Sequence, residues 1–182
     1  MRPPSVKAIT YYGGTMNQLT RSIQVFDRRA KGYEEYSAWC KDDGLYRLCT
    51  EPLEDMIDPI WCLDLACGSG SIGRRNQIET GRKWVFLDLS KEMSKSSSSD
   101  DPITFIQGDA AKLPFVSETF GHVVIRSAMQ FVNAAAVIRE VHRVISPRGH
   151  FVVAQKTRRS DPTDSEWYDQ LYWLRNVTAQ KL

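Results

Sequence analysis

A glycine-rich stretch over residues 68–73 carries the first chemical signal in this sequence, because it matches the pattern G-x-G-x-x-G directly after the apolar run 60–65. Glycine lets the backbone turn sharply and approach a ligand without a Cβ atom in the way. Asp88 follows 20 residues after Gly68, where a carboxylate can accept hydrogen bonds from the two hydroxyl groups of a ribose. The pattern therefore predicts a site for a ligand that contains a nucleoside.

Two further carboxylates distinguish between kinds of nucleoside ligand. Asp64 lies four residues before Gly68, and a carboxylate so close to the loop disfavours a pyrophosphate but suits a cationic amino group. Asp109 follows the third apolar run, where it can accept a hydrogen bond from an adenine amino group. A nicotinamide oxidoreductase would also need a second half-fold, and only residues 155–182 follow the last apolar run. Such an oxidoreductase therefore remains a minor alternative.

Short apolar runs alternate with segments that can form helices, which is the pattern of βαβ units. We expect strands at 60–65, 84–87, 103–106, 122–125 and 150–154. The clearest helix lies over 134–145, with Val137, Ile138, Val141 and Ile145 on its inner side. The sequence thus predicts an α/β fold with a Rossmann-like, mainly parallel sheet and flanking helices. Ligands of such sheets bind outside the carboxyl ends of the strands, where the loop and the carboxylates fall.

The first part of the chain has helical spacing. Apolar residues at steps of three and four predict a helix over 15–31, preceded by a possible glycine hinge at 13–14. A short helix over 33–40 should end near 41–44, and another should begin at Pro52. We therefore interpret 1–58 as an N-terminal helical lid and 59–182 as the core, within one structural domain.

Several segments together resemble a known family. They are 25–33, 63–70, 87–93, 108–115 and 140–149, in the order in which that family carries its motifs. Residues 25–154 are similar to the ubiquinone/menaquinone-biosynthesis type of class I methyltransferase, which depends on S-adenosylmethionine (SAM). The resemblance implies SAM as cofactor, S-adenosylhomocysteine as product, and methyl transfer to O, N or C of a small-molecule acceptor.

The resemblance also implies roles for individual residues. Gly68 and Gly70 would let the backbone approach the cofactor, and Asp64 would orient its methionine end. Asp88 would bind the ribose and Asp109 the adenine amino group. The implied cofactor-binding set is Tyr33, Asp64, Ala66, Gly68, Gly70, Asp88, Leu89, Met93, Asp109, Ala110 and Arg126.

Methyl transfer from a sulfonium needs alignment and exclusion of water more than it needs a base, because the leaving group is already activated. We assign no catalytic residue, and the three histidines are interpreted as structural: His122, His142 and His150. The candidate contacts to the methyl acceptor are Tyr11, Tyr12 and Met16 in the lid, with Met129 and Gln130 after the fourth strand.

The sequence departs from the family at three places. Gly121 stands where the family usually has Asp, and Arg148 stands at a turn position usually given to Gly. The family fold continues into two more strands, whereas here we expect an aromatic helix over 165–175 and a C-terminally shortened sheet. Such a helix needs a covering surface. The helix's own shortened sheet, a homo-oligomer or a partner chain could supply it. A catalytically silent or partner-dependent SAM-binding subunit is therefore the alternative function.

Composition narrows the remaining function classes. The chain has 24 Lys+Arg against 22 Asp+Glu, a net charge of +2 that implies neither nucleic acid nor a membrane surface. Lys156, Arg158 and Arg159 form the single basic cluster, so a nucleic-acid methyltransferase is disfavoured. No apolar run is long enough to span a membrane, and the cysteine spacing predicts neither a metal site nor a disulfide. We therefore expect a cytoplasmic protein without a metal.

Overall fold

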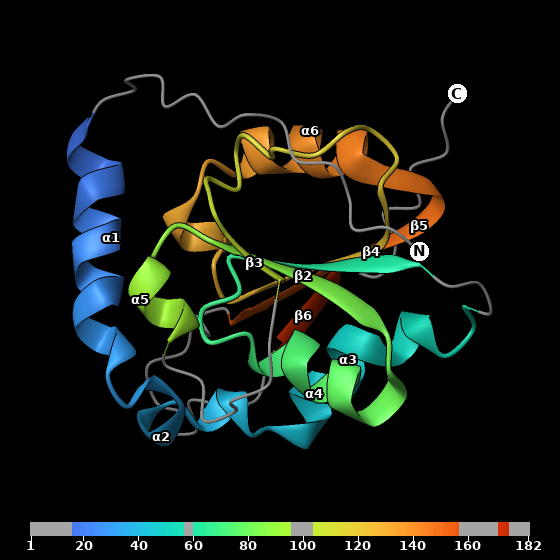
Figure 1. Ribbon diagram of the computed structural model, residues 1–182, viewed down its shortest axis with the longest axis horizontal. Helices are drawn as coiled ribbons and strands as arrows, with labels where there is room; N and C mark the ends of the chain where they lie inside the picture. The colour runs from blue at the N-terminus through green and yellow to red at the C-terminus, as the bar shows by residue number, and fades with distance from the viewer. Residues whose placement is uncertain (1–15, 57–59, 96–103, 157–170, 175–182) are drawn as a thin grey trace.

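A six-stranded sheet forms the centre of the molecule in the computed structural model, which describes residues 16–56, 60–95, 104–156 and 171–174 (Figure 1). The strand order is β3-β2-β1-β4-β5-β6. The strands are β1 (Trp61–Leu65), β2 (Lys83–Asp88), β3 (Thr104–Gln107), β4 (Phe120–Arg126), β5 (Ile145–Lys156) and β6 (Leu171–Leu174). Neighbouring strands from β3 to β5 run parallel, and β6 runs antiparallel to β5. The expected Rossmann-like α/β fold is confirmed.

Helices cover both faces of this sheet. The helices are α1 (Met16–Ala30), α2 (Tyr33–Tyr36), α3 (Asp43–Thr50), α4 (Ser71–Thr80), α5 (Lys91–Ser94) and α6 (Ala134–Val144). Three 3-10 turns add η1 (Ala38–Cys40), η2 (Glu51–Leu53) and η3 (Met129–Phe131). Figure 1 shows α6 over one face of the sheet, α3 and α4 below the other, and α1 standing beside α5.

Each of the parallel strands β1 to β5 contributes to two hydrophobic cores, one on each face. Leu63 and Val123 pack on the α6 side, whereas Cys62 and Trp84 pack on the side of α3 and α4. A strand buried on both faces has no polar side to alternate with its apolar one. This double burial is why the five parallel strands stand out in the sequence as continuous apolar runs.

Three helix predictions differ from the structure in detail. The helical segment ends at Cys40 of η1, as expected, but the polar stretch 41–44 also begins α3, which was not predicted. The Asp42 carboxylate caps α3 by accepting from Leu45 N–H at 2.8 Å. In α6 the buried side chains include Val144, whereas Ile138 is 48% exposed. Pro52 lies in the short η2 turn, so the helix expected to begin there does not form.

The C-terminal helix is also wrong where the structure describes it. Leu171–Leu174 form β6, which pairs with β5 from Val153↔Leu174 to Lys156↔Leu171. An added strand satisfies backbone groups that β5 would otherwise expose at an edge. The rest of the expected helix, 165–170 and 175, lies outside the described residues. The sheet therefore continues beyond β5. Because residues 171–174 form a strand, they give no support to an aromatic helix that would need a covering partner.

Gly121 has a packing reason at the start of β4. A Cβ atom on Gly121 would lie 2.8 Å from Ile60 Cδ1 and 2.9 Å from two further Ile60 atoms. Carbon atoms cannot approach this closely without a shift of the neighbour. Ile60 therefore occupies the space that the family's usual aspartate side chain would need.

Replacing Arg148 with glycine should stabilise the fold. Arg148 is exposed and has a φ angle of 65°, a conformation that costs residues with a Cβ atom roughly 1 kcal/mol. Glycine removes this strain but gains freedom in the unfolded chain, so we expect a net gain of about 0.5 kcal/mol and a Tm higher by roughly 1–2 °C. Arg139→Gly within α6 is the matched control and should lower the Tm. A lower Tm for Arg148→Gly would contradict the assignment of strain.

Candidate functional site

The loop between β1 and α4 has a left-handed backbone at three positions. The φ angles of Ala66, Gly68 and Gly70 are 51°, 59° and 77°, in a region that residues other than glycine rarely adopt. A Cβ atom on Gly68 would lie 3.1 Å from Met93 Cε, so a side chain here would fill the space above the loop. Ser69 Oγ is buried and has no hydrogen-bond partner in the described part of the chain. A buried hydroxyl needs a partner, which a polar ligand can provide.

Asp88, the last residue of β2, binds this loop directly. Its Oδ2 accepts a hydrogen bond from Gly68 N–H at 2.8 Å, and its Oδ1 accepts one from Ser90 N–H at 2.8 Å. The backbone N–H of Leu89 also acts on this carboxylate, and its remaining lone-pair capacity lets Asp88 accept a hydrogen bond from a ligand hydroxyl. Burial raises the pKa of Asp88, while the amide bonds from Ser90 and Gly68 act in the opposite direction. The structure thus joins the glycine loop and the carboxylate into one site.

The lid helix α1 is attached to this site by residues outside the set expected from the sequence. Ser90 Oγ donates a hydrogen bond to Asp27 on α1 and also caps α5 by accepting from Met93 N–H at 3.2 Å. Tyr33 Cε1 lies 3.9 Å from the position that a Cβ atom on Gly68 would take. Tyr33 and Met93 therefore lie against the same part of the loop, and α1 stands beside α5 (Figure 1).

Asp64 lies almost fully buried beneath the first turn of α4. Its side chain accepts a hydrogen bond from Gly73 N–H at 3.3 Å, and the residue is 4% exposed. Burial raises the pKa of Asp64 to about 7, against the opposing influence of the positive charge of Arg126 and the bond from Gly73. Near neutral pH this carboxyl group is therefore close to half ionised, and a cationic ligand group beside it would favour the ionised form.

Asp109 follows β3 in a turn beside the end of β2. Gly108 N–H donates to Asp88 O at 2.9 Å, which fixes the two strand ends together. One oxygen of the Asp109 carboxylate accepts from Ala111 N–H at 2.9 Å, which leaves the other for a ligand. The structure places three further members of the expected cofactor set at this one edge of the sheet: Leu89, Asp109 and Ala110.

Arg126 ends β4 and reaches back to the N-terminal segment. Its Nη1 donates to Trp39 O at 2.8 Å, and its Nη2 donates to Ser71 Oγ at 3.0 Å. Ser71 is the first residue of α4. Arg126 therefore connects η1, β4 and the helix that follows the glycine loop, a contact that the sequence analysis did not foresee.

The η3 turn carries the acceptor candidates that follow β4. Met129 N–H donates to Gln155 Oε1 at 3.2 Å, and Gln130 Nε2 donates to Ser127 O at 2.9 Å. Phe131, which the sequence analysis missed, packs edge-to-face on Phe26 of α1 with ring centroids 5.2 Å apart. Of the lid candidates, Tyr11 and Tyr12 lie outside the described residues, and Met16 is described only as the first residue of α1.

The histidines lie away from the glycine loop. His122 is fully buried in β4, with Nε2 3.0 Å from Cys49 O, and it pairs in register with His150. Burial lowers the pKa of His122 to about 3, so the ring is neutral at ordinary pH. His142 is exposed on α6. No group of histidines, cysteines and carboxylates in the described ranges has the arrangement of a metal site.

Folding stability should fall as acid is added because of His122. The pKa of this ring is lowered in the folded protein, so below its ordinary value of about 6.5 the unfolded chain binds a proton that the folded chain refuses. This term is lost progressively from about pH 6.5 towards pH 3 and amounts to about 2 kcal/mol at about pH 5. The side-chain amide of His122→Gln can still donate to Cys49 O, but it does not titrate. The free energy of urea unfolding of this variant should therefore lack the pH-dependent term. Parallel pH profiles for both proteins would exclude His122 as the cause.

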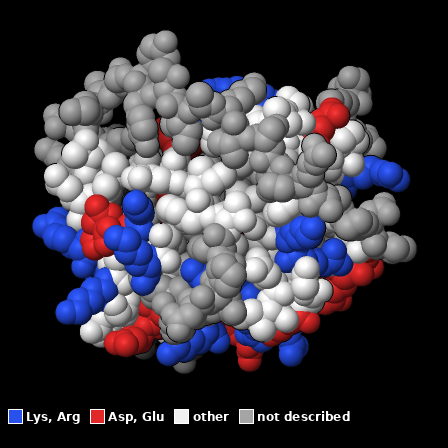
Figure 2. Space-filling view, viewed as in Figure 1, with Lys and Arg blue, Asp and Glu red and all other residues white. Residues whose placement is uncertain are grey.

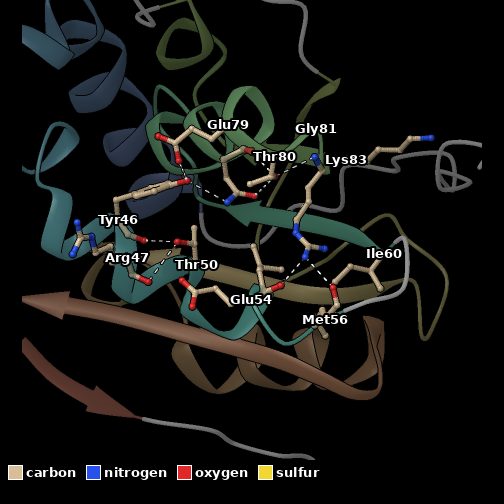
Figure 3. Close-up of a pocket in the computed structure, with 13 residues that line it drawn as sticks. Tyr46, Arg47, Thr50, Glu54, Met56, Ile60, Glu79, Thr80, Gly81 and Lys83 are labelled. Carbon is tan, nitrogen blue, oxygen red and sulfur yellow. Dashed lines mark hydrogen bonds between the residues drawn. The ribbon is translucent and has the colours of Figure 1, made fainter.

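A cavity of about 500 Å³ lies at the opposite end of the sheet, near the starts of β1 and β2 (Figure 3). Hydrogen bonds connect residues of its lining: Asn76 donates to Tyr46 OH, and Tyr46 OH donates to Glu79 at 2.6 Å. Trp84 Nε1, behind the lining, donates to Asn76. Arg82 donates to two backbone carbonyl groups of the η2 region. Ligands of parallel sheets bind at the carboxyl ends of the strands, so this cavity is separate from the site at the loop.

The comparisons with known proteins agree with this geometry. Residues 63–153 match the family model described as a methyltransferase domain. The chain is 29% identical to demethylmenaquinone methyltransferase of Corynebacterium kroppenstedtii over 172 residues, which cover 92% of this chain and 74% of that protein. It is 28% identical to the mitochondrial arginine-hydroxylase NDUFAF5 of Mus musculus over 146 residues, 74% of this chain but only 43% of that longer protein.

This chain is also similar in structure to a solved methyltransferase. The S-adenosylmethionine-dependent methyltransferase of Mesorhizobium loti superposes with a TM-score of 0.52 at 27% identity, covering 63% of this chain and 54% of that chain. None of the helices in the described part of this chain has the length and apolar character needed to cross a membrane. The matched segment runs from the second half of β1 through the glycine loop and Asp88 to most of β5. It covers half of the chain, so the chain belongs to the methyltransferase domain family.

Proposed function

We propose that this chain is a SAM-dependent methyltransferase that transfers a methyl group to O, N or C of a small-molecule acceptor. One observation carries the proposal: the Asp88 carboxylate at the end of β2 accepts a hydrogen bond from Gly68 N–H of the glycine loop at 2.8 Å. Membership of the methyltransferase domain family and the demethylmenaquinone methyltransferase relative support it.

The residues at the loop fit SAM, which supplies a methyl group on an activated sulfonium. Asp88 accepts hydrogen bonds from the ribose hydroxyls, and Asp109 accepts one from the adenine amino group. Asp64 faces the methionine amino group. Met93 and Tyr33, which lie against Gly68, exclude water from this side of the ligand. Ala66, Leu89 and Ala110 complete the walls around the nucleoside.

The acceptor enters beside η3, where Met129 and Gln130 lie after β4. Its nucleophilic atom must approach the methyl group in line with the bond that breaks, so the main task of the protein is alignment. The Phe26–Phe131 contact joins α1 to η3 and limits access of water at this entrance. The chain needs no dedicated base for an acceptor that is already a good nucleophile.

Calorimetric titration of the full chain tests the proposal. SAM and S-adenosylhomocysteine should bind with a stoichiometry of about one, and NAD titrated in parallel should not bind. Binding of NAD alone would replace the proposal with an oxidoreductase. A folded sample that binds no adenosyl ligand would contradict it.

A second candidate is a SAM-binding subunit that depends on a partner or is catalytically silent. The mouse relative is an arginine-hydroxylase, so similarity of sequence does not by itself fix the reaction. The purified chain should form S-adenosylhomocysteine from SAM with a small acceptor when no other protein is present. Turnover that occurs only after a second protein is added would favour the subunit instead.

Nucleic acid remains the least supported acceptor. On the face shown in Figure 2, basic and acidic side chains are mixed and no single-sign patch dominates. Lys156 ends β5, whereas Arg158 and Arg159 of the expected basic cluster lie outside the described residues. A cytoplasmic location stays a prediction from the sequence.

A further inference from the structure

The cavity at the amino ends of the strands lies between α3, the η2 turn and the last turn of α4. Its volume of about 500 Å³ is within the range of roughly 300–1,000 Å³ that small-molecule sites have in proteins. Figure 3 shows Tyr46 and Thr50 on one side of it and Met56 and Ile60 on the other. Leu53, Met56 and Ile60 make part of this lining apolar. The cofactor and the methyl acceptor of the proposed function are expected at the other end of the sheet, so the cavity has no role in methyl transfer.

Arg82 lines this cavity and has no acidic partner in the part of the chain that the structure describes. Its Nη2 donates to Leu53 O at 2.6 Å and to Met56 O at 2.9 Å. Two of the five N–H donors of the guanidinium are therefore occupied, which leaves three. Burial raises the pKa of Cys62 and lowers that of His122, and the positive charge of Arg82 lowers both. This charge thus acts on the core behind the cavity, and no described carboxylate neutralises it.

The remaining charges of the lining leave a small positive excess. Both carboxylate oxygens of Glu79 accept hydrogen bonds from neighbouring side chains, at 2.6 Å and 2.8 Å. Glu54 is exposed, and so are Arg47 and Lys83. With Arg82, three basic side chains line the cavity against two acidic ones among the described residues, a difference of +1. This excess matches a ligand with a single negative charge, and the apolar part of the lining matches a ligand with an apolar body.

We propose that this cavity is a second ligand site, which binds a small organic acid as its carboxylate. The carboxylate accepts hydrogen bonds from the remaining donors of Arg82. The apolar body of the acid packs against Leu53, Met56 and Ile60. This ligand differs from the cofactor and from the methyl acceptor, and the site does not depend on the proposed function.

The competing explanation is that Arg82 only caps the carbonyl groups of the η2 region. Thr50 ends α3 and Thr80 ends α4, so the carboxyl ends of both helices reach this cavity. The last turn of a helix carries a partial negative charge, which together with Glu54 favours a cation. An anion site and a carbonyl cap therefore differ in the charge of the ligand that binds best.

Three probes of similar shape and different charge separate the two explanations: phenylacetate, phenylacetamide and phenethylamine. Each is titrated into the isotope-labelled full chain at neutral pH and followed by NMR. The indole N–H signal of Trp84, identified by its absence in Trp84→Phe, reports on the cavity because it donates to Asn76 of the lining at 3.1 Å. Phenylacetate should shift this signal saturably and bind at least about fivefold more tightly than phenylacetamide, and phenethylamine should bind most weakly.

Arg82→Met should weaken the binding of phenylacetate about five- to tenfold and change the affinity for phenylacetamide less than about twofold. Arg139→Met, on the exposed side of α6, is the matched control and should bind all three probes as the wild type does. If Arg82→Met fails to fold, Arg47→Gln decides, because Arg47 is exposed and its side chain forms no salt bridge among the described residues. It should weaken the binding of phenylacetate about two- to threefold and leave that of phenylacetamide unchanged.

A saturable shift by phenylacetate that excess S-adenosylhomocysteine does not reverse would support the second site. Reversal would place the probe at the cofactor site and overturn the inference. Equal affinities for the three probes, tighter binding of phenethylamine, or no saturable shift would overturn it as well, as would wild-type affinity for phenylacetate in the deciding variant. None of these results bears on the proposed function, which titration with SAM tests separately.

Discussion

Asp88→Asn should weaken the binding of S-adenosylhomocysteine by at least about 30-fold and leave the chain folded. The ionised carboxylate can accept a hydrogen bond from the ribose, and a hydrogen bond to a charged acceptor contributes roughly 1.5–3 kcal/mol. The amide has one acceptor oxygen, and its NH2 group faces either the ribose or a backbone N–H. Because burial raises the pKa of Asp88, removing the buried charge offsets part of the lost backbone bond. We therefore expect the Tm to change by only a few degrees.

Glu92→Gln is the matched control for Asp88→Asn. Glu92 lies on α5 close to the site, is exposed, and pairs with Lys95 at 2.6 Å. Its substitution removes the same charge from the same region but should leave the affinity for S-adenosylhomocysteine unchanged. If Asp88→Asn retained wild-type affinity within about threefold, the ribose would lie elsewhere and the proposed function would lose its main support.

The parallel sheet was predictable because its strands are buried on both faces. Cys62 and Leu63 pack into different cores, yet both must be apolar, and this produces runs that no surface helix would have. The glycine loop was predictable for a related reason. Gly68 and Gly70 meet the demands of local backbone conformation, and local demands leave a direct mark on the sequence.

The misjudged elements depend on context that the local pattern does not contain. Asp42 caps α3, but the same polar residues also occur after helices, so the boundary could be placed on either side. Leu171–Leu174 have helical apolar spacing together with the aromatic content of a strand. The free edge of β5 decides between the two, and pairing with that edge is a tertiary interaction.

The long-range contacts that complete the candidate site could not be predicted from the sequence for the same reason. Asp27 and Ser90 are 63 residues apart, and Arg126 and Trp39 are 87 apart. Nothing in the types of these residues indicates the pairing. The resemblance placed Asp27 in a family-like helix and Arg126 near the cofactor, but the atoms to which their side chains bond follow only from the fold.

The affinity for S-adenosylhomocysteine should rise with pH through neutrality because of Asp64. Burial raises the pKa of this carboxyl group to about 7, and only its ionised form attracts the ammonium group of the ligand. About one tenth of the groups are ionised near pH 6 and about nine tenths near pH 8, so Kd should fall about tenfold over this interval. Asp64→Asn should bind weakly throughout and should retain only the pH dependence that comes from the amino group of the ligand.

The stability of the fold should change with pH in the opposite direction to the affinity: relative to the Asp64→Asn variant, the wild type should become less stable as the pH rises. The folded pKa of Asp64 lies above its unfolded value, so the folded state holds an extra proton. The stability that this proton confers is complete below about pH 4 and is lost as the pH rises to about 7. At about pH 8 the wild type carries a buried charge that asparagine lacks, and the variant should be more stable by roughly 1–3 kcal/mol. The difference should shrink towards about pH 4, and a variant that melted lower yet bound normally would make Asp64 a structural residue.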